Sequence, residues 1–124
     1  MRSRLLAAAA AVALLGSPCH AAAPKVLSAL TNTAVAVKAS PGLLVSVDCD
    51  NANAALVYLQ WYDTTGAVTV GTTAAKYTTT VPATVGARFL PSINFYAGMK
   101  VAATTTSTGG TAPGTALNCS VGFQ

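Results

Sequence analysis

Two segments of the chain, 43–50 and 117–123, alternate apolar and polar residues, and each places one cysteine on its apolar side. Such period-two alternation is typical of a β-strand with one face against a core. We therefore expect Cys49 and Cys119 to lie inward and to form one disulfide between an early strand and the last one. This bond would close a loop of about 70 residues and, in the chain-entropy model, stabilise the fold by at most about 4 kcal/mol. Two free buried thiols are the alternative. The inward side of the earlier segment is predicted to consist of Leu43, Val45, Val47 and Cys49.

Residues 1–21 have the layout of a secretory signal peptide: two arginines near the start, an apolar run, and small residues before a cleavage point predicted within two residues of Ala21. The apolar run is too short to cross a bilayer, so we predict no transmembrane anchor. We expect a secreted or periplasmic protein, which leaves association with the cell surface open. Cleavage would remove Cys19 and the chain's only histidine, His20. In the alternative, a lipoprotein, Cys19 would carry the lipid.

The remaining residues, 22–124, are enough for one domain. They hold five basic side chains against three aspartates, a net charge of +2, and no glutamate. Because the basic residues are scattered, nothing in the sequence predicts a nucleic-acid partner. Without a histidine, this part of the chain also lacks the base that Ser-His-Asp and Cys-His hydrolases use. We predict no cofactor, because the Gly109-Gly110 pair has no strand-to-helix context.

The chain after the leader reads as short strands separated by turns, which predicts an all-β fold. We expect an antiparallel β-sandwich of jelly-roll or Greek-key type. Residues 22–33 are predicted to form an N-terminal arm and residues 34–124 the sandwich domain. Such an arm could add to the sheet of a second copy, so a homo-oligomer stays open. A flexible polar loop is expected at 106–115. The expected strands are 35–38, 43–50, 55–63, 67–70, 76–81, 87–90, 93–95, 100–105 and 117–123.

The segment 55–63 supplies the candidate ligand-binding residues. Tyr58, Gln60 and Tyr62 are predicted to face outward, and Trp61 to face the core. Exposed aromatic rings beside an amide are typical of sugar-binding surfaces, which stack and hydrogen-bond their ligands. The alternative is that these side chains pair across strands and stiffen the sheet.

Asp48, Asp50, Asn51 and Asn53 offer oxygen atoms at alternating positions and form a weak calcium candidate. The run lacks the turn glycine and the bidentate glutamate that such a loop uses, so we predict no metal site. The alternative is a solvated strand end followed by a turn. Asp48 and Asp50 also share one strand face about 7 Å apart, a spacing that leaves hydrolysis with two carboxylates as a remote alternative.

The stretch from Gly42 to Phe123 resembles a loose set of small β-sandwich proteins that are common in tailed-phage and prophage genomes. The resemblance implies a structural or binding role on a particle or surface, and it carries over no catalytic residue. The matching residues are Asn51, Asn53, Tyr58-Leu59-Gln60, Tyr62-Asp63, Gly71-Thr72-Thr73, Gly98 and Val101-Ala102-Ala103-Thr104-Thr105-Thr106.

Cys49, Trp61 and Cys119 also resemble the cysteine, core tryptophan and distant second cysteine of the immunoglobulin framework. An immunoglobulin-like sandwich is therefore the alternative topology.

Together these features predict an exported, non-enzymatic structural or binding module that acts by surface contact, in adhesion, decoration or the cell envelope. Its expected partner is a protein or glycan surface. The alternative is a carbohydrate-binding module that uses Tyr58, Gln60 and Tyr62, and a secreted hydrolase is the remote alternative.

Overall fold

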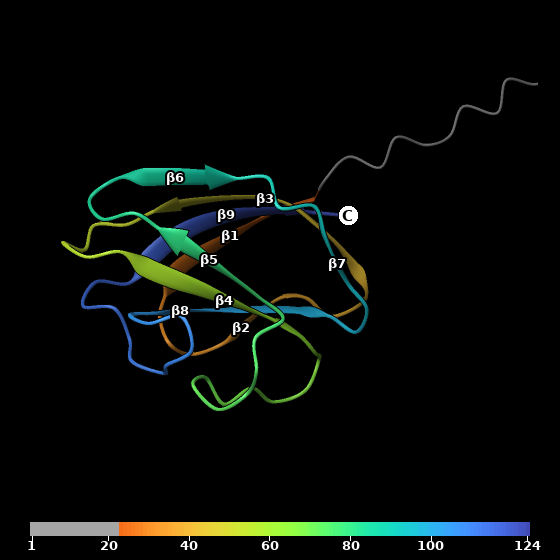
Figure 1. Ribbon diagram of the computed structural model, residues 1–124. Helices are drawn as coiled ribbons and strands as arrows, with labels where there is room; N and C mark the ends of the chain where they lie inside the picture. Colours follow the sequence, from red (N-terminus) through yellow and green to blue (C-terminus); the bar gives the residue numbers. More distant parts are fainter. Residues whose placement is uncertain (1–22) are drawn as a thin grey trace, which may run out of the picture.

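The computed structural model describes residues 23–124, so the predicted signal peptide, with Cys19 and His20, lies outside the described residues. Within 23–124 the chain forms nine β-strands and no helix, and the strands build two antiparallel sheets packed face to face (Figure 1). The predicted all-β antiparallel sandwich is thus confirmed. The strands are β1 (Ala23–Leu30), β2 (Val35–Lys38), β3 (Gly42–Asp50), β4 (Val57–Asp63), β5 (Tyr77–Val81), β6 (Gly86–Phe89), β7 (Ile93–Phe95), β8 (Met99–Thr104) and β9 (Leu117–Phe123).

The strand order shows how the chain moves between the sheets. The first sheet has the order β1-β9-β3-β6, with β7 also pairing with β3, and the second has the order β2-β8-β4-β5. Of the strands paired within the described sheets, only β4 and β5 follow each other directly in the sequence. Most connections therefore cross from one sheet to the other, and β1 and β9, far apart in the sequence, lie side by side.

The core lies between the sheets and is lined by the inward residues of both. Trp61 of β4 is fully buried, and its ring centroid lies 6.3 Å from that of Phe95 in a tilted arrangement. Leu59 from the second sheet and Val121 from the first are also fully buried. The inward placement of Trp61 expected from the alternation is therefore confirmed. Burial of each apolar side chain of this kind stabilises the fold by about 1.5–3 kcal/mol.

The predicted disulfide joins Cys49 of β3 to Cys119 of β9, with a sulfur–sulfur distance of 2.01 Å. The two residues are direct partners in the antiparallel register of the first sheet, and each is only 3% exposed. The bond therefore ties an early strand to the last strand inside the core, as expected, between two neighbours within one sheet.

One detail of β3 differs from its sequence pattern. Leu44 is fully buried, whereas Leu43 and Val45, which we expected to face the core, are partly exposed. The register between β3 and β9 shifts between Leu44 and Ser46, which leaves Val45 as an extra residue. Such a β-bulge reverses the direction of the side chains on one side of it.

The expected N-terminal arm is instead part of the sandwich. Residues 23–30 form β1, which pairs with β9, and Leu27 and Leu30 are buried in the core. Their spacing of three breaks the period of a strand because a register irregularity separates them, where Ala29 has a φ of 55°. The expected strand at 67–70 is absent, since this segment belongs to a loop.

Candidate binding surface

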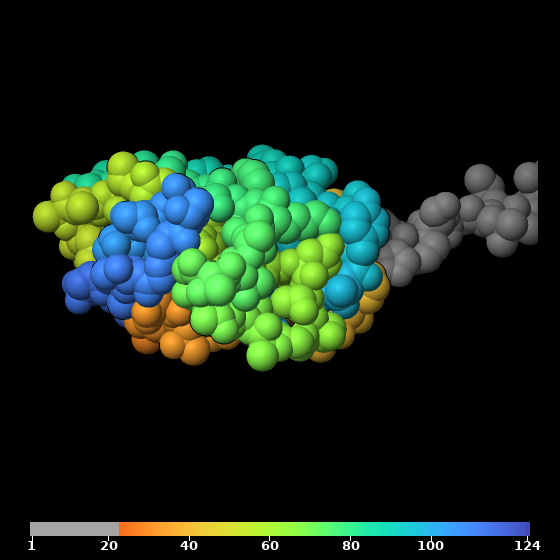
Figure 2. All heavy atoms as spheres, turned by 60° about the horizontal axis from the view of Figure 1, so that its bottom comes forward, coloured from red at the N-terminus to blue at the C-terminus, as the bar shows by residue number. Residues whose placement is uncertain are grey.

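The two sheets differ in what lies over their outward sides. Two loops, 64–76 and 105–116, lie over the second sheet, and they fill much of the face that comes forward in Figure 2. We call this side the covered face; its outward residues beneath the loops are Gln60, Tyr62, Ala102 and Thr104, all at most 1% exposed.

Gln60 fastens the second loop to the sheet. Its Nε2 donates to Thr104 Oγ1 at 2.8 Å and to Gly109 O at 2.8 Å, and its Oε1 accepts from the Tyr62 hydroxyl at 2.6 Å. Burial raises the pKa of the Tyr62 hydroxyl. The prediction that Gln60 and Tyr62 point outward from the sheet is right, but the prediction that they are exposed is wrong, because the loop covers them. Tyr58 alone of the three predicted ligand-binding residues is partly exposed.

The two loops also meet each other. A Cβ added to Gly71, whose φ is +87°, would come within 2.7 Å of the Gly110 nitrogen, so this approach requires glycine. Asn32 Nδ2 donates to Gly110 O at 2.6 Å, and Pro113 is buried. The segment 106–115, expected as a flexible loop, is therefore held down by hydrogen bonds. Between the loops lies a depression of about 300 Å³, lined by Gln60, Thr72, Thr73, Thr78, Ser107 and Thr108 among others.

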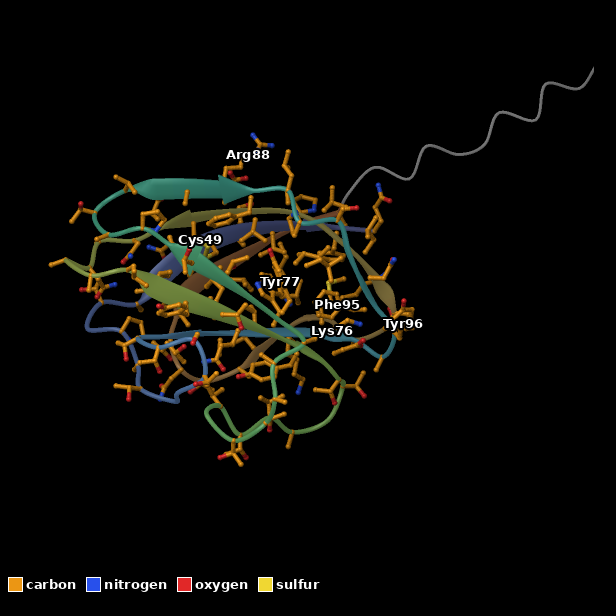
Figure 3. All side chains as sticks on the ribbon, viewed as in Figure 1. Cys49, Lys76, Tyr77, Arg88, Phe95 and Tyr96 are labelled. Atoms are coloured by element: carbon orange, nitrogen blue, oxygen red, sulfur yellow. A yellow bond between two sulfur atoms is a disulfide. The ribbon has the colours of Figure 1, made fainter. Side chains whose placement is uncertain are left out.

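The outward side of the first sheet is different, and no described loop lies over it in Figure 1. We call it the open face, defined by Asp48, Asp50, Arg88, Asn118 and Ser120. The register places Ser120 of β9 beside Asp48 of β3, and Asp48 beside Arg88 of β6. In the next row, Asn118 lies beside Asp50, which lies beside Gly86. Figure 3 shows Arg88 pointing away from the sandwich.

The open face carries a shallow depression of about 370 Å³, bordered on β1 by Val26. Small residues explain it: Gly86 has no side chain opposite Asp50, and a Cβ there would lie 2.9 Å from Asp50 Oδ1. Arg88 Nε lies 3.6 Å from Asp48 Oδ1, and their side chains are 70% and 48% exposed. An ion pair so exposed is weak, so these charged groups are available to a partner.

The weak calcium candidate does not assemble into one site. Asn51 is 2% exposed, its Oδ1 accepts from the Asn53 nitrogen at 2.9 Å, and its Nδ2 donates to Pro82 O at 2.9 Å. Asn53 Oδ1 accepts from the Thr115 nitrogen at 2.7 Å. These amides join three loops and do not converge with Asp48 and Asp50 on the open face. Within 23–124, no three His, Cys, Asp or Glu side chains gather as metal ligands would.

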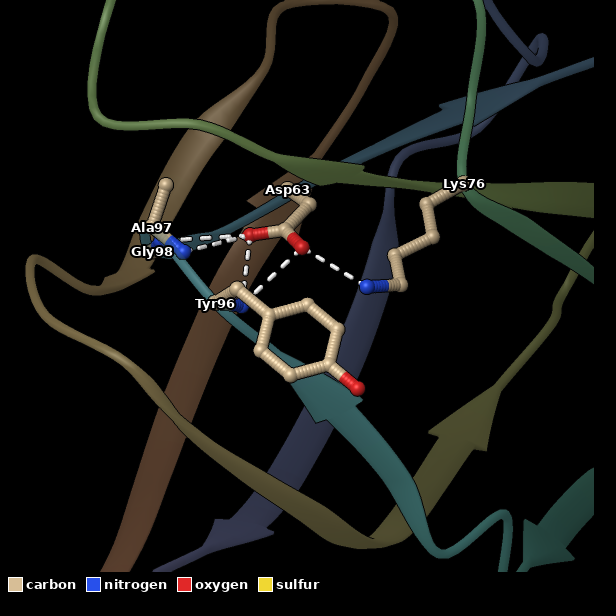
Figure 4. A network of polar contacts seen from close by, with 5 residues as sticks. All are labelled: Asp63, Lys76, Tyr96, Ala97 and Gly98. Carbon is tan, nitrogen blue, oxygen red and sulfur yellow. Dashed lines mark hydrogen bonds and ion pairs between the residues drawn. The ribbon is translucent and has the colours of Figure 1, made fainter.

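Sequence reasoning missed a polar cluster at the end of β4 (Figure 4). The Asp63 carboxylate accepts backbone hydrogen bonds from Tyr96 at 2.9 Å, Ala97 at 2.7 Å and Gly98 at 3.4 Å. Its other oxygen lies 2.7 Å from Lys76 Nζ, which in turn lies 4.3 Å from the centre of the Tyr96 ring. Because successive backbone N–H groups form an anion-binding turn, no side-chain motif marks this cluster in the sequence.

The cluster fixes the charge of Asp63. Partial burial removes water from the carboxylate, which by itself would raise its pKa. The Lys76 ammonium and the backbone N–H groups of Tyr96, Ala97 and Gly98 outweigh this and hold the pKa of Asp63 well below its usual range. Asp63 is thus an anion that anchors the turn between β7 and β8, and its bonding capacity is occupied within the chain.

No protein-family model, curated protein sequence or solved structure matches the chain. Among residues 23–124 there is no helix that could span a membrane.

Proposed function

We propose that this protein is an exported, non-catalytic contact module that holds the surface of another protein against its open face. The observation that carries the proposal is the contrast between the two sheets. One outward side is closed by the protein's own loops, whereas the other presents charged and amide side chains around a depression of about 370 Å³. A sheet face that stays uncovered and presents exposed charged and amide side chains suits contact with a polar partner.

Export is supported by the covalent structure and by the leader. A buried disulfide between Cys49 and Cys119 is typical of oxidising compartments. The signal-peptide layout of residues 1–21 points the same way. Intact-mass measurement of the recovered protein checks this part of the proposal, because cleavage near Ala21 removes a defined mass.

The non-catalytic reading is supported by the surroundings of the aspartates. Asp63 is occupied by Lys76 and three backbone N–H groups. Asp50 is exposed and Asp48 is half exposed on an open sheet face. A hydrolase would have to use these two carboxylates without an enclosed site to exclude water from the reacting groups.

A protein partner is favoured over a glycan because the open face has no aromatic ring on which a sugar could stack. The residues first considered for a sugar, Gln60 and Tyr62, are buried beneath the loops of the covered face.

We also infer that the sandwich is a jelly roll. Its two strand orders, β1-β9-β3-β6 and β2-β8-β4-β5, place early strands beside late strands in both sheets, as two Greek keys would.

Binding of the labelled, exported protein to washed producer cells tests the proposal, with and without prior protease treatment of the cells, beside a printed glycan array. Ser120→Arg would fill the depression and should weaken cell binding at least tenfold. Thr72→Arg, at the depression on the covered side, is the matched control and should leave binding unchanged. Protease treatment of the cells should abolish binding. Protease-resistant binding together with array signals would favour the carbohydrate-binding alternative, and equal binding by Ser120→Arg and the wild type would refute the proposal.

A further inference from the structure

The edge strands of the two sheets are not equally protected. β2 is four residues long, and Lys25 and Lys38 donate to main-chain carbonyls at Ala36 and Pro41 around it. β6 is also four residues long and carries Arg88. Short length and charged side chains are the devices by which edge strands avoid pairing with other chains.

β1 is longer than these strands, and its one charged side chain, Lys25, reaches across to Ala36 O of β2. β1 is eight residues long and pairs only with β9, so one side of its main chain has no neighbouring strand within the described sheets. Val26 at its middle is 72% exposed. An exposed edge with a free row of N–H and C=O groups is a template for another strand.

Pro24 indicates which main-chain groups of β1 point to the free side. Proline lacks an N–H and is tolerated in an edge strand where its nitrogen faces away from the neighbour. We therefore place the main-chain groups of 24, 26 and 28 on the free side. The Ala29 N–H, at an odd position, points the other way and donates to Asn118 Oδ1 on β9 at 3.1 Å.

We propose that β1 is a homodimer contact, in which β1 of one copy pairs antiparallel with β1 of a second copy about a two-fold axis at Val26. In this register the two Val26 residues exchange both main-chain hydrogen bonds, and each Ser28 N–H donates to Pro24 O of the other copy. Because Pro24 has no N–H, Ser28 O of the other copy accepts no main-chain hydrogen bond from it, and each 24–28 pair is held by one bond instead of two. The two exposed Val26 side chains cover each other on the same side of the sheet.

The dimer has a functional consequence that goes beyond single contact. It joins two first sheets into one continuous sheet, so that two open faces lie side by side and point the same way. Two linked sites bind a repetitive surface with higher avidity than either alone. The contact is small compared with stable interfaces of about 1,600 Å², so we expect a weak, concentration-dependent dimer.

Cysteine cross-linking tests the register. In the proposed pair the Cα atoms of the two Val26 residues are about 5.5 Å apart, within disulfide reach. Val26→Cys should therefore form a covalent dimer under mild oxidation. Ser28→Cys, on the same strand and also exposed, is the matched control: the two Ser28 residues lie about 14 Å apart along the strands, so it should stay monomeric. Cross-linking of Ser28→Cys to the same extent would overturn the proposal.

Sedimentation equilibrium of the exported protein, whose N-terminus is established by intact mass, tests the dimer without a new thiol. The wild type should dimerise with rising concentration. Val26→Lys sets two ammonium groups opposite each other and should raise the dissociation constant at least tenfold, whereas Val85→Lys, at an exposed valine away from β1, should leave it unchanged. A wild type that is monomeric at all concentrations would overturn the proposal. Ser120 is the β9 partner of Val26, so partner binding is tested separately with Asp50→Arg on β3, which does not adjoin β1 in the sheet order. Loss of dimerisation and loss of partner binding are then separate results.

Discussion

The covered face and the open face are both outward sides of antiparallel sheets, yet their residues are of different kinds. Gln60, Tyr62 and Thr104 on the covered face are uncharged, and each can be satisfied by one or two partners that a loop or its neighbour supplies. On the open face, Asp48, Asp50 and Arg88 carry charges, and a loop laid over them would have to remove their water at a high cost. Lys100 of β8 also points outward on the covered side, but it is partly exposed and its Nζ donates to Gly66 O of the first loop at 2.6 Å. The loops therefore bury uncharged amide and hydroxyl groups, whereas the charged groups of both sheets keep contact with water.

The largest effect on the covered face should come from removing the hydrogen bonds of the Gln60 side chain. Gln60→Ala leaves the Tyr62 hydroxyl without its acceptor and Gly109 O without its donor, all in a buried place. We expect a loss of about 3 kcal/mol in the free energy of unfolding. The matched change on the open face is Asn118→Ala, which truncates an exposed amide that accepts one N–H, and should cost less than about 1 kcal/mol.

Urea unfolding measures both variants. Equal losses for Gln60→Ala and Asn118→Ala would mean that the loops do not seal the covered face. A second readout is the tyrosine titration: once the loop loosens, the raised pKa of Tyr62 should fall toward its ordinary value.

Gln60 and Tyr62 also show which structural properties could be predicted from the sequence. Alternation predicted β3, β4 and β9 and the direction of Gln60 and Tyr62, because side-chain direction is a local property of a strand. Exposure is not local: it depends on Gly109, far along the chain, reaching back to Gln60. No period in the sequence encodes such a contact, so the predicted ligand-binding surface was wrong about burial.

β1 and the Asp63 cluster escaped prediction for two further physical reasons. An irregularity between Leu27 and Leu30 breaks the period by which a strand is recognised. The partners of Asp63 are mainly main-chain N–H groups, which every residue but proline carries, so no residue type marks them. The disulfide, by contrast, was predictable because only two cysteines lie after residue 21.

A pH titration tests the contribution of Asp63, at the end of β4 in the second sheet, to stability. Because the folded-state pKa of Asp63 lies below that of an unfolded aspartate, near 3.9, its anchoring contribution is fully present above that value. The contribution is lost as the pH falls below about 4 and through the folded-state pKa. Asp63→Asn keeps the shape but removes the charge, and should lower stability at neutral pH by about 2 kcal/mol. Its stability should also fall less steeply than that of the wild type between pH 4 and pH 2. Parallel acid-unfolding curves for the two proteins would contradict this account.

The smallest expected effect comes from the open face itself. Arg88→Ala removes an ion pair with a 3.6 Å separation between two exposed side chains, so it should change the free energy of unfolding by less than about 0.5 kcal/mol. What remains of the effect should vanish in high salt, which screens exposed charges. Thermal unfolding at low and high salt measures this. A loss of more than about 1 kcal/mol would mean that the Arg88 side chain stabilises the fold itself. Arg88 would then be engaged within the chain, as Gln60 is on the covered face, and would not be available to a partner.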